Sequence, residues 1–185
     1  MRLVNIASYW MKAAILPMGN RPAIFFDRDG VLNKDVHYLY RKEDFKWIPG
    51  AIESIQYFNK LGYYVFVITN QSGVARGYYT EQDVQRLHQW MNQQLAIQQA
   101  HIDDFFYCPH HSVGIIPLYT KTCSCRKPHT GMIEQAQKKY AIDMKKSFLV
   151  GDKTSDMECA KNAGILGIQF TGDNLYEIVA KNHIK

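Results

Sequence analysis

Short apolar runs alternate with amphipathic segments along most of this chain. The first run, residues 23–27 (AIFFD), ends in an acid and predicts a buried strand. Comparable runs follow at 63–69, 103–108, 147–152 and 166–170. Each run is nearly continuous in apolar residues, which is typical of strands that are covered on both faces of a parallel sheet.

Segments with the helical spacing of apolar residues separate these runs. They cover residues 49–62, 80–99, 131–142 and 155–164, and a short helix is expected at the C-terminus. The second of them opens with Thr80, a favourable N-cap residue. Its predicted buried face consists of Val84, Leu87, Met91 and Leu95. Strands that alternate with helices predict an α/β fold, a Rossmann-like parallel sheet with helices on both faces.

The length of 185 residues predicts one domain, which we place at residues 21–185. Residues 1–20 show neither periodicity nor a motif, so we interpret them as an N-terminal extension. Lys12 and Pro17 interrupt any secretory signal, and no run of about 18 apolar residues predicts a membrane span. We therefore expect a cytoplasmic protein without a membrane partner.

The charge of the chain is moderately basic, at +5. This balance suits an anionic partner such as a phosphorylated metabolite, a nucleic acid or a membrane surface, but an ordinary solvated surface explains it equally well. Charge alone therefore does not choose a function.

Polar side chains follow the predicted strands where each one ends. Asp27 and Asp29 follow the first strand, Thr69 closes the second, and Asp152 closes the fourth. Ligands of such sheets bind beyond the carboxyl ends of the strands. We therefore expect these carboxylates, the hydroxyl and nearby lysines to converge at one edge, unless the acids only cap the strand ends.

Two common phosphate or metal motifs do not account for this set. A calcium loop of the EF-hand type needs an acid or amide where Phe25 stands and a glutamate where Val36 stands. A P-loop needs glycine immediately before its lysine, and Asp152 occupies that position. Both motifs are excluded.

The whole set resembles a known superfamily. The segments DRDGV, ITN, RKP and GDKTSD occur in the order and on the predicted strands of the haloacid dehalogenase superfamily of phosphotransferases. The resemblance implies the fold of that superfamily. Residues 31–48 are too few for a large cap domain, so an open active site is expected.

The resemblance also implies catalytic roles. Asp27 is expected to attack phosphorus and form an aspartyl-phosphate, while Asp29 exchanges protons with the leaving alkoxide and with water. Thr69 and Lys127 are expected to stabilise the transferring phosphoryl oxygens. Mg²⁺ is expected to bind the carboxylates of Asp27 and Asp152 and the backbone carbonyl of Asp29.

A second metal site is predicted in the segment from Cys108 to His129. Cys108, His110, Cys123 and Cys125 combine soft thiolates with one imidazole, a set that favours tetrahedral Zn²⁺. Four protein ligands leave no open position, so this zinc would be structural. His111 competes with His110, and the family pattern favours His110. The alternative is a group of buried cysteines without a metal.

Longer segments narrow the resemblance to a subfamily. TNQSGVARG, CPHH, CRKPHTGM and GDKTSDM are similar to the group that contains D-glycero-D-manno-heptose 1,7-bisphosphate and histidinol-phosphate phosphatases, and their details favour the heptose enzymes. The implied reaction removes the C7 phosphate, a step toward the nucleotide-activated heptose of lipopolysaccharide core. The implied substrate contacts are Arg28, Asp35, Val36, His37, Tyr38, Asn70, Gln71, Ser72, Arg126 and Lys153.

Other functions remain open at this point. Histidinol phosphate is the alternative substrate within the subfamily, and a nucleic-acid 3′-phosphatase shares the DxDG motif. No basic tract interleaved with aromatic residues extends beyond RKP, so we expect no nucleic-acid partner. A catalytically inactive scaffold is disfavoured because every required acid is present. We expect a monomer, since no apolar stripe remains after the core is assigned. Relatives usually begin close to the first strand, so Met18 is an alternative start.

Overall fold

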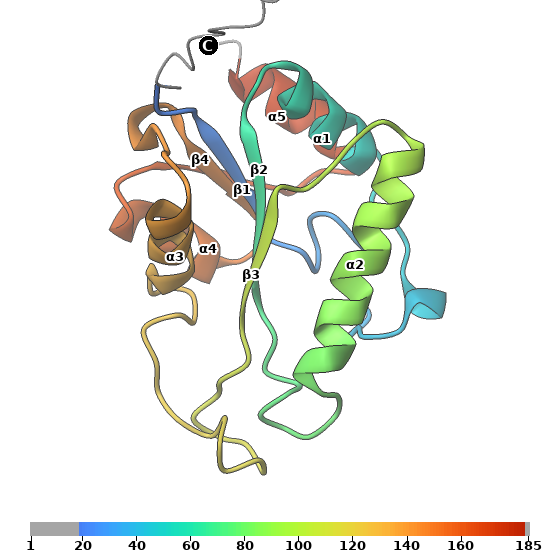
Figure 1. Ribbon diagram of the computed structural model, residues 1–185, viewed down its shortest axis with the longest axis vertical. Coiled ribbons are helices and arrows are strands. Elements are labelled where there is room, and N and C mark those ends of the chain that lie inside the picture. Colours follow the sequence, from blue (N-terminus) through green and yellow to red (C-terminus); the bar gives the residue numbers. More distant parts are fainter. Residues whose placement is uncertain (1–18, 184–185) are drawn as a thin grey trace, which may run out of the picture.

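A parallel sheet forms the centre of the computed structural model, which describes residues 19–183 (Figure 1). Its strand order is β3-β2-β1-β4-β5. The strands are β1 (Ala23–Phe26), β2 (Tyr64–Asn70), β3 (Asp104–Cys108), β4 (Phe148–Gly151) and β5 (Leu166–Gln169). All neighbouring pairs are parallel, which confirms the predicted fold class. Most of the predicted N-terminal extension, residues 1–18, lies outside the described residues.

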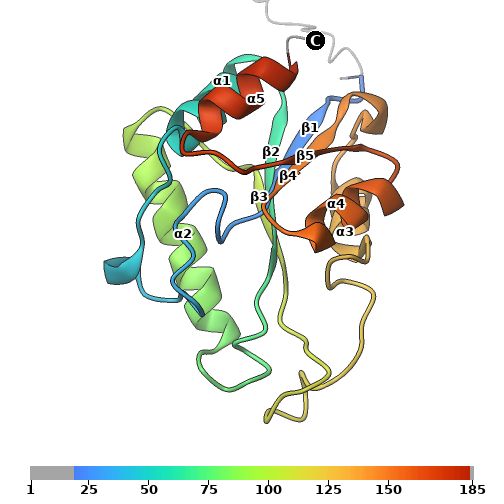
Figure 2. The same cartoon turned by 180° about the vertical axis from the view of Figure 1, so that it is seen from behind.

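Helices cover both faces of this sheet, as the two opposite views show (Figures 1 and 2). The helices α1, α2 and α5 lie on one face, and α3 and α4 lie on the other. Their bounds are α1 (Ala51–Lys60), α2 (Glu81–Ile97), α3 (Gly131–Lys139), α4 (Thr154–Asn162) and α5 (Leu175–His183). Two short 3-10 turns are η2 (Lys42–Asp44) and η3 (Met144–Lys146). The segment between β1 and α1 contains η2 and no domain of its own.

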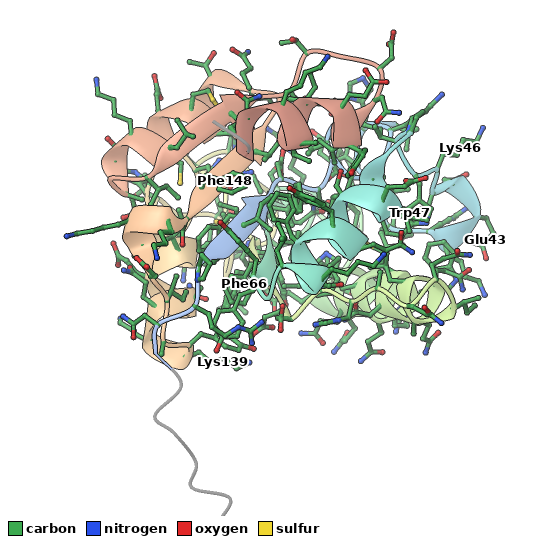
Figure 3. All side chains as sticks on the ribbon, turned by 90° about the horizontal axis from the view of Figure 1, so that it is seen from above. Glu43, Lys46, Trp47, Phe66, Lys139 and Phe148 are labelled. Atoms are coloured by element: carbon green, nitrogen blue, oxygen red, sulfur yellow. The ribbon has the colours of Figure 1, made fainter. Side chains whose placement is uncertain are left out.

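Two large hydrophobic cores result, one on each face of the sheet, beside a small third cluster of Val74, Tyr79 and Val84. Ile24 and Phe26 of β1 belong to the core under α1, α2 and α5, whereas Ala23 and Phe25 belong to the core under α3 and α4. Burial on both faces explains why each strand reads as a continuous apolar run. Each fully buried aliphatic or aromatic side chain stabilises the folded state by roughly 1.5–3 kcal/mol relative to the same side chain in water. Figure 3 shows Phe66 in the packed centre.

The longest helix, α2, begins as its sequence predicts. Asp83 N donates to Thr80 Oγ1 at 3.2 Å, and Thr80 N donates back to the Asp83 carboxylate at 2.8 Å, forming a capping box. The predicted apolar face is buried, and it also contains His88, a polar residue that apolar periodicity does not include. This histidine lies directly beneath the site described below.

The helix predicted over residues 131–142 is shorter in the structure and ends at Lys139. Tyr140 adopts extended backbone, with φ −129° and ψ 144°, and its ring packs 5.1 Å from Tyr64 and 4.9 Å from Phe66. Ile142 then pairs with Arg21 in an isolated parallel bridge. Packing of these rings against the sheet therefore overrides the helical pattern.

Candidate active site

Asp27 is the first residue of the site, and it follows β1 directly. Its N–H still donates to Val150 O at 2.9 Å, so the sheet geometry fixes the backbone at this position. The carboxylate Oδ1 accepts from Arg28 N at 2.8 Å and lies 2.8 Å from Lys127 Nζ. Burial raises the pKa of Asp27 to about 6, against the opposing effect of the Lys127 charge. Asp27 is therefore a buried carboxylate held on one oxygen.

Lys127 is an enclosed cation of the site, with 2% of its side chain exposed. Its Nζ lies 2.8 Å from Asp27, 2.7 Å from Asp156 and 2.9 Å from Ile68 O. Burial disfavours the charged form, but the charges of Asp27 and Asp156 outweigh it and raise the pKa of Lys127. The ammonium group therefore stays charged between the ends of β1, β2 and β4.

Asn70 fixes the backbone of Lys127. Its amide Nδ2 donates to Lys127 O at 3.2 Å, and its Oδ1 accepts from Lys127 N at 3.0 Å. The last residue of β2 thus clamps the segment that arrives from the cysteine-rich loop. The sequence predicts Asn70 only as a substrate contact, and this clamp is an additional role.

Asp29 is surrounded by donors. Arg28 donates to it through Nε and Nη2 at 2.9–3.2 Å, Asn33 Nδ2 donates at 3.0 Å, and Gln71 Nε2 donates at 2.9 Å. The same Gln71 nitrogen donates to Thr69 Oγ1 at 2.9 Å. Gln71 therefore links Asp29, the acid after β1, to the Thr69 hydroxyl near the end of β2.

Arg28 differs from the sequence-based expectation of a substrate contact. The residue is fully buried, and its guanidinium is directed inward to Asp29, His88 and the carbonyl of Leu39. The backbone reverses at DRDG, so the side chain between the two aspartates lies under the site and not at its rim. Its position supports Asp29 from below.

Three carboxylates gather where β4 ends. Oxygen atoms of Asp27, Asp152 and Asp156 lie within 4.8 Å of one another. Asp156 accepts from Lys153 N at 3.0 Å and so caps the start of α4. Asp152 Oδ1 is buried and has no hydrogen-bond partner among the described residues. Burial also raises the pKa of Asp152.

These carboxylates fit a hard divalent cation, because Mg²⁺ prefers oxygen ligands and the unpartnered Asp152 oxygen needs a positive charge. Gly30 makes the arrangement possible. Its φ of +94° favours glycine, and a Cβ at this position would overlap the Asp152 carboxylate. The predicted pair Asp27 and Asp152 is thus brought together by the structure.

A hollow of about 260 Å³ opens at the same edge of the sheet, and the carboxylates of Asp27, Asp152 and Asp156 are not part of its lining. It is lined by Asp29, Asp35, His37, Tyr38, Asn70, Gln71, Ser72, Tyr79, Arg126, Lys153 and Ser155. The predicted contacts therefore gather around one opening, except for buried Arg28 and for Val36, which lines a neighbouring hollow. Tyr79 and Ser155 also line the hollow, and the sequence motifs did not identify them as site residues.

An ion pair crosses this hollow. Lys153 Nζ lies 3.2 Å from Asp35 Oδ2, and His37 N donates to Asp35 Oδ1 at 3.0 Å. Partial burial would raise the pKa of Asp35, but the hydrogen bond from His37 and the charge of Lys153 outweigh it and lower that pKa. His37 and Tyr38 both have left-handed backbone, with φ 57° and 54°. Such strain at a rim of polar residues is typical of ligand sites.

The predicted zinc ligands also come together. His110 Nδ1 lies 3.7 Å from Cys108 Sγ and 3.4 Å from Cys125 Sγ, and the sulfur atoms of Cys108, Cys123 and Cys125 lie 3.0–3.4 Å apart. Tetrahedral Zn²⁺ with Zn–S bonds of about 2.3 Å separates its sulfurs by about 3.7 Å. The four residues therefore fit a closed tetrahedral site after a small expansion. The hydrogen bond between Cys108 and Cys125 lowers the pKa of Cys125 to about 5 and raises the pKa of Cys108, so the two sulfurs share a proton that a metal would displace.

The loop that carries these ligands docks on the segment after β2. Ile115 N and Ile116 N both donate to Ala75 O, at 2.8 and 3.0 Å. Val113, Ile115 and Leu118 of this loop are exposed. Apolar side chains are therefore left exposed at this loop, although the sequence predicts no leftover apolar stripe.

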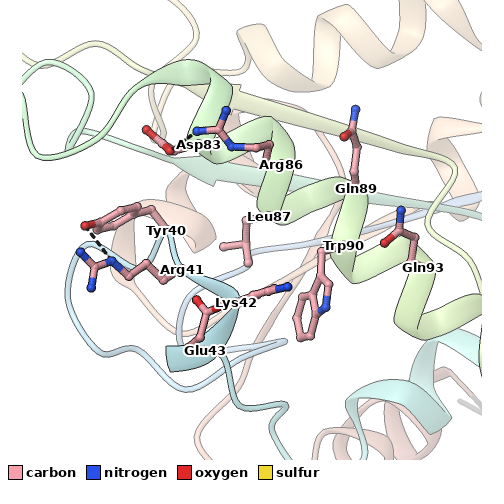
Figure 4. Close-up of a pocket in the computed structure, with 10 residues that line it drawn as sticks. All are labelled: Tyr40, Arg41, Lys42, Glu43, Asp83, Arg86, Leu87, Gln89, Trp90 and Gln93. Atoms are coloured by element: carbon pink, nitrogen blue, oxygen red, sulfur yellow. Dashed lines mark hydrogen bonds and ion pairs between the residues drawn. The ribbon is translucent and has the colours of Figure 1, made fainter.

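A separate hollow of about 400 Å³ lies between η2 and α2 (Figure 4). Its lining includes Tyr40, Lys42, Leu87 and Trp90 and none of the residues that the sequence predicts for the site.

No helix among the described residues is long and apolar enough to cross a membrane.

Comparison with known proteins agrees with this site. Residues 22–171 match the family described as polynucleotide kinase 3 phosphatase. A D-glycero-beta-D-manno-heptose-1,7-bisphosphate 7-phosphatase of Rhodopseudomonas palustris is 50% identical over 155 residues, which is 84% of this chain and 86% of the relative. A D-glycero-alpha-D-manno-heptose-1,7-bisphosphate 7-phosphatase of Photorhabdus laumondii is 50% identical over 141 residues, 76% of this chain and 77% of the relative.

The fold comparison gives the same result. The structure of D,D-heptose 1,7-bisphosphate phosphatase from B. bronchiseptica, complexed with magnesium and phosphate, matches with a TM-score of 0.72 and 30% identity, and covers 86% of each chain. The fold, the convergent acids and these relatives agree with the motifs of the sequence. The chain therefore belongs to the haloacid dehalogenase superfamily of phosphatases and, within it, to the family that contains the heptose-bisphosphate 7-phosphatases.

Proposed function

We propose that this protein is a Mg²⁺-dependent phosphatase that removes the C7 phosphate of D-glycero-D-manno-heptose 1,7-bisphosphate through an aspartyl-phosphate. The observation that carries the proposal is the buried ammonium of Lys127 bridging Asp27 and Asp156 at 2.8 and 2.7 Å, beside the hollow of the site. A fixed buried cation among the ends of the strands suits a phosphoryl group. The relatives at 50% identity support the heptose substrate.

Asp27 acts as the nucleophile in this proposal. Lys127 and Arg28 N both contact Oδ1, so Oδ2 is the oxygen that attacks phosphorus. The P–O bond to the sugar breaks as the Asp27–P bond forms, and water then attacks the aspartyl-phosphate to release phosphate. Lys127 and Thr69 compensate the negative charge on the phosphoryl oxygens during both displacements.

Asp29 moves the protons. It donates one to the departing sugar alkoxide and takes one from the water that opens the aspartyl-phosphate. Gln71 holds one oxygen of Asp29 and also donates to Thr69, so a single amide aligns both groups. Asp27, Asp152 and the backbone carbonyl of Asp29 would hold Mg²⁺, which would neutralise the repulsion between the nucleophile and the phosphate dianion.

The far end of a bisphosphate requires further cations. Arg126 and Lys153 line the same hollow, and we assign them to the second phosphate. Lys153 is paired with Asp35 in this structure, so a second phosphate competes with Asp35 for its ammonium group. His37, Tyr38 and Ser72 contact the sugar in this proposal. Val36, in the segment between β1 and α1, contacts the sugar from the edge of the hollow.

Zn²⁺ is proposed as a structural ion at Cys108, His110, Cys123 and Cys125. The loop carries little core of its own and leads directly into Arg126 and Lys127, so a metal there fixes the phosphate-binding residues. We further propose a cytoplasmic location, because clustered cysteines in a reducing compartment more often bind metal than form disulfides. The expected oligomeric state is a monomer. Light scattering of the purified protein tests the monomer.

The test is a substrate panel with purified enzyme, Mg²⁺ and no chelator. We expect the heptose bisphosphate, offered as both anomers, to be hydrolysed with a kcat/KM far above that of histidinol phosphate or a DNA 3′-phosphate. Asp27→Asn should abolish turnover, whereas the exposed Asp44→Asn should not. Preference for histidinol phosphate would keep the mechanism and refute the substrate. A preference for the DNA end, with binding that weakens as salt increases, would favour the nucleic-acid phosphatase.

A further inference from the structure

A histidine lies inside the apolar core directly beneath the site. His88 of α2 is buried, and its ring stacks on Phe105 with centroids 4.4 Å apart and an interplanar angle of 15°. Burying an imidazole among apolar groups costs free energy unless a polar partner compensates. That partner is Arg28, whose Nη1 lies 3.2 Å from His88 Nε2.

The chemistry of the two groups fixes the direction of this contact. A guanidinium has only donors, so Nε2 of His88 must accept and the ring proton must lie on Nδ1. Burial and the charge of Arg28 both lower the pKa of His88 well below its usual value. The ring is therefore a neutral acceptor for a buried cation.

Arg28 has a distinct partner at each end of its guanidinium. Nε and Nη2 donate to Asp29, Nη2 also donates to Leu39 O at 2.9 Å, and Nη1 faces His88. Among the described residues, His88 is the acceptor available to Nη1. Removing it leaves a buried N–H without a partner and frees the planar group to rotate, which moves the donors that hold Asp29.

We propose that His88 is a positioning residue that acts through Arg28 on Asp29. By fixing the plane of the guanidinium, it fixes the plane of the Asp29 carboxylate. The Asp29 side chain is 18% exposed and lines the hollow. Asp29 then meets the leaving oxygen in the geometry that proton transfer requires. The inference rests on the proposed function, because it assigns His88 to the acid–base half of that reaction.

The test compares two leaving groups and two substitutions. His88→Leu removes the acceptor, whereas His88→Gln places Oε1 near the position of Nε2 and can still accept from Arg28. The heptose bisphosphate has an alkoxide leaving group that needs a proton, and p-nitrophenyl phosphate has one that leaves unprotonated. Met91→Ala, one turn along the same buried face, controls for loss of stability.

For His88→Leu we expect kcat/KM on the heptose bisphosphate to fall by roughly 10- to 100-fold, because small misplacement of an acid removes much of its effect. On p-nitrophenyl phosphate, kcat/KM should change by less than about threefold, since this constant reports only the steps through leaving-group departure. His88→Gln and Met91→Ala should stay within about threefold on both substrates. In an Asp29→Asn background, His88→Leu should add less than about threefold.

Equal losses on both substrates, equal losses for the Leu and Gln variants, or unchanged kinetics of His88→Leu would each overturn the inference. If His88→Leu does not fold, His88→Met takes its place, because a thioether sulfur accepts only weakly from Arg28. A wild-type enzyme inactive on both substrates would refute the proposed function itself. An active wild type with an unaffected His88→Leu variant would refute only the role of His88.

Discussion

Replacing Asp27 by asparagine should stabilise the metal-free protein while destroying its activity. The carboxylate is buried and lies close to Asp156, so its ionisation is costly even beside Lys127. Burial raises its pKa from 3.8 to about 6. Asparagine has nearly the same shape and no charge, so it removes this cost.

The magnitude follows from the displacement of the pKa. Roughly two pKa units at 1.36 kcal/mol each give about 3 kcal/mol at pH 7.5. The direction of the pH dependence follows from proton binding. Between pH 4 and 6 the folded protein binds more protons at Asp27 than the unfolded chain does. The free energy of unfolding of the wild type therefore falls as pH rises through this range. The advantage of the variant should therefore be about half as large at pH 5 and vanish below about pH 4. The stabilisation of about 3 kcal/mol is an upper limit, because the amide of the variant side chain must turn its oxygen toward Lys127.

The assay is urea denaturation of wild type and Asp27→Asn at pH 5 and 7.5, in magnesium-free buffer without chelator, so that zinc is retained. Asp44→Asn, an exposed carboxylate, should change the unfolding free energy by less than about 0.5 kcal/mol. Added Mg²⁺ should stabilise wild type more than the variant, because it binds the ionised carboxylate. A variant less stable than wild type at pH 7.5, or an advantage that does not shrink at pH 5, would refute the reasoning.

Three further predictions concern the supports of the site. Cys125→Ser should remove about one zinc per chain by elemental analysis and lower Tm by roughly 5 °C or more; an unchanged Tm would contradict a structural ion. Gly30→Ala should weaken Mg²⁺ binding by about tenfold or more in calorimetry, because the new Cβ displaces Asp152, and unchanged affinity would refute that contact. Tyr79→Phe removes the 2.6 Å hydrogen bond to Gln71 Oε1 and should lower kcat by roughly 3- to 10-fold, whereas unaltered kinetics would show that Gln71 needs no anchor.

The strands and the edge of the sheet that carries the site could be predicted from the sequence. Continuous apolar runs are a direct consequence of burial on both faces, and the parallel arrangement brings strand ends together without further information. The N-cap at Thr80 follows from local chemistry and is confirmed. Local sequence patterns were therefore sufficient to predict a residue's role when its partners lie in the same helix or strand.

Side-chain directions that depend on distant partners could not be predicted. The motif DRDG does not reveal that Arg28 turns inward, since this depends on His88 and Leu39 arriving from other segments. The clamp of Asn70 on Lys127 likewise joins residues that are 57 positions apart. The available signal was His88 itself, a polar residue at a buried position of an otherwise apolar helix face.

The most direct test of the account is to look for the phosphoryl group on Asp27. Wild-type enzyme would be mixed with excess heptose bisphosphate and Mg²⁺, quenched in acid during turnover, digested, and analysed by mass spectrometry. We predict one added phosphoryl group on the peptide that contains residues 23–27, localised to Asp27 and absent from Asp27→Asn. Turnover without any phosphorylated peptide, or a phosphoryl group on another residue, would contradict the nucleophilic role of Asp27.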